Sequence, residues 1–182
     1  MKITSGQYKY RNIIVPKDIR PTTEKVREAI FSMIMEWIPG ATVLDLFAGS
    51  GAMGLEALSR GSEVCYFNEK NRANFRVLLD NINHCNANEK SIVTNLDYQT
   101  CLSNSSSIFD IVILDPPYSN VDYYSNAFNL LQDNCLIEAG SVVVAEHLFE
   151  NKLDDNYGKL KKIKEKKYGT IGVDIFLMSE YW

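Results

Sequence analysis

The segment VLDLFAGSGAMGLEAL, residues 43–58, decides the fold. It begins as a short apolar run typical of a buried strand and continues through glycines at positions 49, 51 and 54 into an expected helix. Glu69 follows at the end of the next expected strand, 20 residues beyond Gly49. Glycines let backbone amides approach a ligand closely, and an acid at that spacing can accept hydrogen bonds from a ribose diol. The segment therefore predicts a strand–turn–helix unit that binds a nucleotide-type cofactor, although this glycine spacing alone also occurs in simple tight turns.

The rest of the chain repeats this alternation of strand and helix. Short apolar, β-branched runs predict five buried strands, at residues 42–47, 63–67, 91–95, 110–114 and 141–145. Helices are expected between them, at residues 53–60, 70–84 and 122–137. Five such units predict an α/β, Rossmann-like sheet that is mostly parallel, with helices on both faces. The segments KLKKIKEKKYG and TIGVDIFLM, residues 159–169 and 170–178, then predict a closing hairpin with one antiparallel strand.

A further helix is expected before the first strand. In RPTTEKVREAIFSMIMEWI, residues 20–38, a proline and two threonines favour a helix start, and apolar residues follow at helical spacing. Pro39 and Gly40 end it. At 182 residues the chain fits one domain, 1–182, in which residues 1–40 form an N-terminal basic segment and helix that cover the site, and residues 41–182 form the catalytic α/β core.

The composition predicts the cellular location of the protein and the state of its cysteines. The sequence has no apolar stretch of membrane-spanning length and no secretory signal at its start, so we expect a cytoplasmic protein with no membrane association. The four cysteines and two histidines lack metal-ligand spacing, which predicts reduced, mostly core cysteines, no disulfide and no metal.

The net charge of −4 is unevenly distributed. Residues 1–40 hold seven Lys and Arg against four Asp and Glu, residues 159–182 hold six against three, and residues 41–158 hold the remaining six against sixteen. Such asymmetry is compatible with a basic nucleic-acid-binding face beside an acidic body. Lysines that only keep exposed surfaces hydrated would explain the same pattern.

A second motif, FDIVILDPPYSN, spans residues 109–120. It places Asp115 at the carboxyl end of the fourth expected strand, the edge at which open α/β sheets bind ligands. The Asp115 carboxylate and the Pro116 carbonyl could accept the two hydrogens of an exocyclic base amine and aim its lone pair at a methyl group. Pro116 and Pro117 would hold these acceptors rigidly, and Tyr118 offers a flat face for an unstacked base. The alternative is a strand-ending turn with a packed tyrosine.

These motifs resemble those of a known family. DPPY resembles motif IV of the amino-methyltransferases, and DLFAGSG, residues 45–51, is similar to their S-adenosylmethionine (SAM) motif I. The opening SGQYKYRNI, the following RPTTEKVREAIF and the terminal YGTIGVDIF resemble the RsmD-type 16S ribosomal RNA guanine-N2 methyltransferases. This resemblance covers nearly the whole chain. It implies a class I fold of seven strands with an antiparallel seventh.

The resemblance also implies roles for individual residues. Asp45 would help to place the methionine end of SAM, Glu69 would take the ribose, and Asp97 would meet the adenine unless it only caps the next turn. The implied cofactor-binding set is Arg20, Thr22, Thr23, Asp45, Phe47, Ala48, Gly49, Ser50, Gly51, Glu69, Lys70 and Asp97. Helix capping is the alternative role for the two threonines. For Glu146 and His147, which end the fifth strand near the site, we expect structural roles.

The chain departs from the family pattern at Ser5 and Tyr10, which replace glycines. If those positions require a positive φ, the opening loop must be built differently here. Lys9, Arg11 and Lys17 are the candidate phosphate contacts.

The sequence thus predicts a SAM-dependent methyltransferase that acts on a guanine N2 amine in 16S ribosomal RNA or the assembling small ribosomal subunit, as a monomer. An adenine-N6 methylase of DNA or RNA is the alternative, because DPPY does not identify the base. An NAD-dependent oxidoreductase and a non-catalytic RNA-binding module are further alternatives, the first supported only by the glycine spacing.

Overall fold

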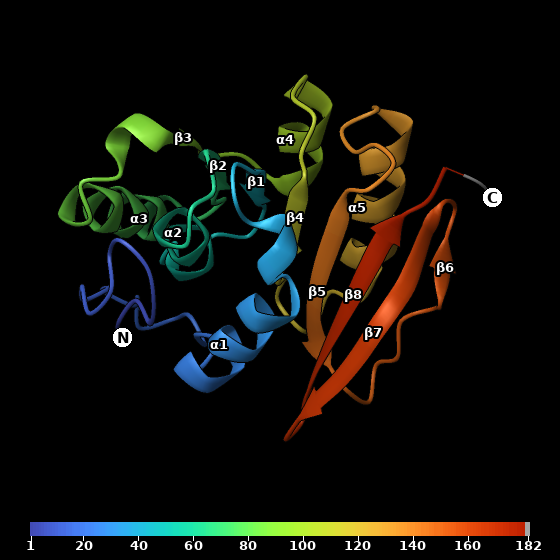
Figure 1. Cartoon of the computed structure of the whole chain (residues 1–182), viewed down its shortest axis with the longest axis horizontal. Coiled ribbons are helices and arrows are strands. Elements are labelled where there is room, and N and C mark those ends of the chain that lie inside the picture. Colours follow the sequence, from blue (N-terminus) through green and yellow to red (C-terminus); the bar gives the residue numbers. More distant parts are fainter. Residues whose placement is uncertain (181–182) are drawn as a thin grey trace.

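The computed structural model describes residues 1–180, and the last two residues of the expected domain, 181 and 182, lie outside the described part. Its centre is one eight-stranded sheet in the order β3-β2-β1-β4-β5-β8-β7-β6 (Figure 1). The parallel strands are β1 (Thr42–Asp45), β2 (Val64–Asn68), β3 (Ser91–Thr94), β4 (Ile111–Leu114) and β5 (Val142–Leu148). Each lies where a buried strand was expected, which confirms the doubly wound α/β fold.

The sheet closes with the expected hairpin of β7 (Leu160–Tyr168) and β8 (Ile171–Met178). Strand β8 runs antiparallel to both β5 and β7. The expectation of seven strands was wrong by one, because a two-residue strand, β6 (Asn156–Tyr157), pairs antiparallel with the start of β7. Gly158, with φ 61°, makes the turn that brings β6 back onto its neighbour.

The helices are α1 (Glu24–Met33), α2 (Ala52–Ser59), α3 (Arg72–His84), α4 (Tyr98–Asn104) and α5 (Asp122–Asp133), with 3₁₀ turns at Met35–Trp37 and Asn88–Lys90. The helix expected over residues 20–38 is shorter than predicted, because the chain tightens into a 3₁₀ turn after Ile34. Helix α4 was not predicted. Its seven residues are too few to show a clear helical periodicity.

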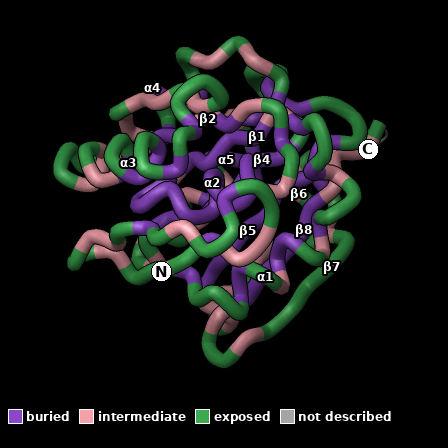
Figure 2. Tube along the Cα trace, turned by 60° about the vertical axis from the view of Figure 1, so that its left-hand side comes forward, coloured by how far each residue is buried: buried purple, intermediate pink, exposed green. Residues whose placement is uncertain are grey.

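Apolar side chains pack on both faces of the sheet. Val43 of β1 belongs to one hydrophobic cluster with residues of α1, α2 and α3, whereas the adjacent Leu44 belongs to a second cluster with residues of α4 and α5. Successive side chains of a strand point to opposite faces, so strands covered on both sides must be apolar throughout. The central strands are accordingly buried in Figure 2.

The N-terminal segment is anchored to α2 by a buried carboxylate. Glu56 Oε1 accepts a hydrogen bond from Thr4 N at 2.9 Å, and Glu56 Oε2 accepts one from Ser5 N at 3.2 Å. Arg27 and Arg60 neutralise the same carboxylate, each at 3.0 Å. A buried charge needs such partners, and here they also fix the path of the opening loop.

Ser5 and Tyr10, which stand where the family has glycines, differ in backbone conformation. Tyr10 itself adopts a left-handed conformation, with φ 71°, whereas Ser5 does not. The loop therefore keeps its left-handed turn at position 10. For a side chain such as tyrosine this conformation costs about 1–2 kcal/mol.

Within residues 1–180, none of the helices has the length and apolar character needed to cross a membrane. The same residues contain no group of three or more His, Cys, Asp or Glu arranged to hold a metal ion. The thiols of Cys65, Cys85 and Cys101 are buried in the core and that of Cys135 is exposed.

Candidate active site

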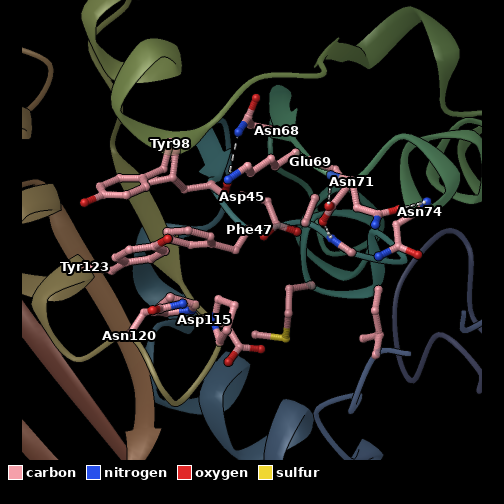
Figure 3. Close-up of a pocket in the computed structure, with 18 of the residues that line it drawn as sticks. Asp45, Phe47, Asn68, Glu69, Asn71, Asn74, Tyr98, Asp115, Asn120 and Tyr123 are labelled. Atoms are coloured by element: carbon pink, nitrogen blue, oxygen red, sulfur yellow. Dashed lines mark hydrogen bonds between the residues drawn. The ribbon is translucent and has the colours of Figure 1, made fainter. Parts of the chain in front are cut away.

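The carboxyl ends of β1, β2 and β4 open into one cavity of about 1200 Å³, shown in Figure 3. The glycine loop, the DPPY segment and part of the N-terminal segment all line it. The predicted site residues that line it are Arg20, Thr22, Asp45, Phe47, Ala48, Gly49, Ser50, Glu69, Lys70, Asp97, Asp115, Pro116, Pro117 and Tyr118. The cavity thus joins the two motifs that the sequence analysis singled out.

Five predicted residues do not line this cavity. Gly51 is buried behind the loop, where it caps the start of α2. Thr23 is exposed and accepts a hydrogen bond from Val26 N at 3.3 Å, the helix-capping role that was its alternative. Lys9, Arg11 and Lys17 lie elsewhere on the N-terminal segment. Lys9 and Lys17 are exposed and Arg11 is half-buried.

The glycine loop is shaped by close contacts and by one carboxylate. Gly49 has φ 55°, and a Cβ at this position would lie 2.9 Å from Ile19 Cδ1 of the N-terminal segment. Gly49 N donates a hydrogen bond to Glu69 Oε1 at 2.9 Å, and Asn71 N donates one to Glu69 Oε2 at 2.7 Å. Glu69 therefore holds the loop against the end of β2. Gly49 and Ile19 both line the cavity, and the contact with Ile19 leaves no room for a side chain at position 49.

Asp45 lies at the end of β1, buried beneath the loop. Gly54 N donates a hydrogen bond to its Oδ2 at 3.0 Å. Burial raises the pKa of Asp45 to about 7, the hydrogen bond opposes this rise, and the charge of Glu69 adds to it. Burial therefore disfavours the charged form of the Asp45 carboxyl relative to an exposed carboxyl.

Asp97 caps the helix that was not predicted. Its Oδ1 accepts a hydrogen bond from Thr100 N at 2.9 Å, and its Oδ2 accepts one from Thr100 Oγ1 at 2.7 Å. These bonds lower the pKa of Asp97. The capping role, one of the two alternatives, is thus seen in the structure, and contact with an adenine stays a prediction.

The DPPY segment meets an acid from the neighbouring strand. Asp115 follows β4, and Glu146, in β5, is only 5% exposed. Thr22 Oγ1 lies 2.5 Å from Glu146 Oε2 and 3.5 Å from Asp115 Oδ2, so one hydroxyl bridges the two carboxyl groups. The Tyr118 hydroxyl donates a weaker bond to Glu146 Oε1 at 3.3 Å. Glu146 therefore lies behind the cavity wall and is hydrogen-bonded to Thr22 and Tyr118, two residues that line the cavity.

Burial and like charge act together on this acidic pair. Desolvation raises the pKa of Asp115 well above its usual range, and the charge of Glu146 raises it further. Burial also raises the pKa of Glu146, against the opposing effect of the Thr22 hydroxyl. Two carboxylates that share a desolvated site do not both ionise readily. The pair therefore holds a proton at a pH at which a lone exposed carboxyl would have lost it.

An aromatic wall lines the cavity beside β1, and of its members only Phe47 was predicted (Figure 3). The ring centroids of Phe47, Tyr98 and Tyr123 lie 4.5–6.0 Å apart. Further lining residues that were not predicted are Met53, Asn68, Asn71, Asn74, Asn120 and Asn126. Met53 and Asn120 lie inside the two quoted motifs, but their side chains carry no chemistry that singled them out, and the asparagines outside those motifs are recognised only once the sheet edge is assembled.

The strand order and the position of the cavity define a class I methyltransferase fold, with its ligand site at the carboxyl ends of the parallel strands. The sequence profile of the family described as Conserved hypothetical protein 95, the RsmD family, matches residues 1–177. The chain belongs to this family.

Individual relatives agree with this assignment. The chain is 33% identical to the YlbH protein of Bacillus subtilis (strain 168) over 181 residues, which cover 97% of this chain and 98% of that protein. It is 32% identical to ribosomal RNA small subunit methyltransferase D of Escherichia coli (strain K12) over 178 residues, which cover 97% of this chain and 89% of the relative. The solved structure of Escherichia coli yhhF superposes with a TM-score of 0.89 at 32% identity and covers 98% of both chains.

Proposed function

We propose that this chain is a SAM-dependent methyltransferase that transfers a methyl group to the exocyclic N2 amine of a guanine in small-subunit (16S) ribosomal RNA. One observation carries the proposal: the glycine loop and Asp115 line the same cavity, so a methyl donor on the loop and an amine at Asp115 can meet there. The Escherichia coli relative that is 32% identical over almost the whole chain is named ribosomal RNA small subunit methyltransferase D.

The residues present fit a SAM molecule. Gly49 lines the cavity without a side chain, and its neighbour Ile19 leaves no room for one, so the position must stay a glycine. Glu69 is held by two backbone amides at the end of β2, where an acid can accept hydrogen bonds from a ribose diol. Asp45 lies at the end of β1, close to the place expected for the methionine end. When bound, SAM supplies an electrophilic methyl group on a sulfonium.

The acceptors at the DPPY segment would prepare the amine. An exocyclic base amine is a poor nucleophile because its lone pair is delocalised into the ring. The Asp115 carboxylate and the Pro116 carbonyl accept its two hydrogens, and the fixed φ of each proline limits their movement. Alignment of reactants can lower a barrier by about 7–11 kcal/mol, whereas acid–base assistance contributes about 10²–10⁴ in rate. Positioning is therefore the main contribution of this segment.

Tyr118 would stack against the base. Its ring is half-buried, and the Arg20 guanidinium lies 6.0 Å from its centroid. Burial first, and then the charges of Glu146 and Asp115, raise the pKa of its hydroxyl, so the ring stays uncharged. Stacking of a base on an aromatic ring is worth about 1–3 kcal/mol. An unstacked guanine can thus be held flat while its amine reaches Asp115.

The partner RNA would contact the N-terminal segment. Lys9, Arg11 and Lys17 are the proposed phosphate contacts, and the exposed Tyr10 lies between the first two. Lys9 Nζ lies 4.9 Å from the centroid of the Tyr10 ring. Such a basic and aromatic surface suits an unpaired strand beside the target nucleotide. The substrate is the 16S ribosomal RNA or the assembling small subunit, and the protein acts as a monomer.

The test is incubation with labelled SAM and, in separate reactions, unmodified small subunits, free 16S ribosomal RNA and duplex DNA, followed by nucleoside analysis. We expect N2-methylguanosine from a ribosomal substrate. N6-methyladenine would assign the adenine-N6 alternative instead. A thermal-shift titration with SAM and with NAD separates the cofactors, because only a ligand of the folded state raises the melting temperature; stabilisation by NAD alone would reject methyl transfer.

A further inference from the structure

Three segments far apart in the sequence meet at the second carboxyl group of the site. Glu146 of β5 contacts Thr22, which is 124 residues away, and Tyr118, which is 28 residues away. The Tyr124 hydroxyl of α5 donates a hydrogen bond to the Glu146 backbone carbonyl at 2.6 Å. Both ends of Glu146 are therefore held, its carboxylate by side chains of the site and its backbone by α5.

The hydrogen bonds of the Glu146 carboxylate lead to Thr22 and Tyr118, two residues beside Asp115. One oxygen bonds the hydroxyl of Tyr118, the proposed stacking residue, and the other bonds the Thr22 hydroxyl that also lies 3.5 Å from Asp115. Burying a carboxylate costs free energy because it loses its hydration, and an apolar side chain could fill the same space without that cost. Its partners indicate that the carboxylate holds the reactive side chains in place.

The charged and titratable groups around Asp115 and Glu146 favour the state in which the two carboxyl groups together hold one proton. Asp45, Tyr118 and Tyr124 face the pair from β1, the DPPY segment and α5, and Arg20 of the N-terminal segment is the nearby cation. Two negative charges in this site would repel one another, and one proton removes that repulsion.

We propose that Glu146 is a positioning residue of the methyl-transfer site and that it acts with Asp115 as one unit: the two carboxyl groups share one proton and accept a second from the amine as it is methylated. This inference rests on the proposed function. It adds Glu146 and Thr22 to the reaction as residues that orient Asp115 and Tyr118 and set the charge of the acceptor.

The proton and electron balance is complete. The nitrogen lone pair forms the new N–C bond, and the S–C bond of the sulfonium breaks with its electron pair remaining on sulfur, which becomes neutral. The nitrogen is then positively charged and releases one N–H proton to Asp115. Because the pair begins with one proton and one negative charge, it ends neutral with two protons, and one of these returns to water after the product leaves.

The first test does not depend on activity. The carboxyl ¹³C signals of Asp115 and Glu146 are followed by NMR against pH in the wild type and in Glu146→Gln. We expect two coupled steps for the wild-type pair and a single step for Asp115 in the variant, at a lower pH than the upper step of the wild type. An Asp115 signal that titrates identically in both proteins would overturn the shared proton.

Thr22→Val provides an independent test with a predicted sign. The Thr22 hydroxyl lowers the pKa of both carboxyl groups, so its removal must raise the pH of their titration steps. Valine keeps the size of threonine, and this variant reports on the pair even if Glu146→Gln does not fold. Unchanged steps in Thr22→Val would contradict the bridging role of the hydroxyl.

The second test measures catalysis on the small-subunit substrate. Glu146→Gln should lower kcat by about 10²-fold, with little change in KM and a shifted pH profile, since it removes proton-accepting assistance. Glu146→Asp should recover part of the rate. Glu150→Gln, an exposed glutamate just beyond β5, is the matched control and should keep full activity.

The outcomes separate the two proposals. Equal kcat in Glu146→Gln and wild type would overturn the role of Glu146 and leave the methyltransferase assignment intact. Coupled carboxyl titration without any methyl transfer would instead contradict the proposed function and retain the shared proton.

Discussion

The backbone amide of Gly49 donates a hydrogen bond of 2.9 Å to Glu69 Oε1, which ties the glycine loop to the acid that follows β2. The second oxygen of the same carboxylate accepts a bond from Asn71 N at 2.7 Å. Glu69 therefore shapes the loop in addition to offering its lone pairs to a ligand. A preformed loop reduces the ordering cost of binding.

Glu69→Ala should weaken SAM binding by about 10–100-fold. A hydrogen bond to a charged group is worth about 1.5–3 kcal/mol, and the substitution removes two such bonds along with the expected ribose contact. Isothermal titration calorimetry with SAM measures the change. Glu63→Gln, an exposed acid before β2, is the control. Affinity within twofold of the wild type in Glu69→Ala would contradict the role of this acid.

Asp115→Ala should retain SAM binding and lose turnover by at least about 10²-fold, because it removes one of the two acceptors that aim the amine. Calorimetry measures the first quantity and methyl incorporation into small subunits measures the second. Asp133→Asn, an exposed acid at the end of α5, serves as the control. Undiminished turnover in Asp115→Ala would remove this residue from the mechanism.

Gly54→Ala should destabilise the fold by about 1–3 kcal/mol through overpacking. A Cβ at Gly54 would lie 2.3 Å from Phe67 Cε1 and 2.8 Å from Cys65 Sγ, so α2 could not keep its close approach to β2. Urea unfolding measures the loss. Combined with Phe67→Leu, the substitution should cost less than the sum of the two single changes, because the leucine makes room; strict additivity would show that the contact is not the cause.

His147 should make stability depend on pH near neutrality. His147 Nδ1 lies 2.8 Å from the Leu148 carbonyl, and its Nε2 lies 3.1 Å from Asp174 Oδ2. Burial lowers the pKa of His147, but the bonds to Asp174 and Leu148 outweigh it and raise the pKa above its usual 6.5. The resulting stabilisation is complete below about pH 6.5 and is lost as the pH rises through the pKa of the folded state.

The measurement is urea unfolding over a series of pH values from about pH 6 upward, starting below the usual histidine pKa. Asp45 and Asp115 titrate in every variant, so the pH dependence of His147 is isolated by subtracting that of His147→Gln. His84→Gln, at the exposed end of α3, should behave like the wild type. Equal pH dependence in His147→Gln and the wild type would show that folding leaves the pKa of His147 unchanged, against the raised pKa.

Replacing Lys9 or Arg11 by alanine should weaken binding of small-subunit RNA and reduce its dependence on salt. Each lost phosphate contact lowers the slope of log affinity against log salt concentration by about 0.7–0.9. Filter binding over a range of potassium chloride concentrations measures the slope. Lys90→Ala, in the exposed 3₁₀ turn before β3, is the control; a slope unchanged by Lys9→Ala and Arg11→Ala would place the RNA elsewhere.

Local sequence signals were enough to predict the main strands and helices of the sheet. The five central strands, the helices that follow Gly51 and Asn71, and the closing hairpin all lie where apolar runs and turn residues predicted them. Such signals are encoded within a few residues, because strand and helix periodicities and turn preferences act over short distances. The two-residue β6 and the seven-residue α4 carry too little periodicity for the same reasoning to find them.

The sequence by itself predicted the two halves of the proposed site, the glycine loop with Glu69 and the DPPY segment with Asp115, since each is a compact motif at a strand end. Only the tertiary structure decided that Glu146 lies beside Asp115. It also decided that Thr22 bridges the two, although it is 93 residues from Asp115 and 124 residues from Glu146. The sheet order sets these neighbours, because it places β5 beside β4 and leads the N-terminal segment across both ends. Contacts between distant segments depend on how the whole chain packs, and no short stretch of sequence records that packing.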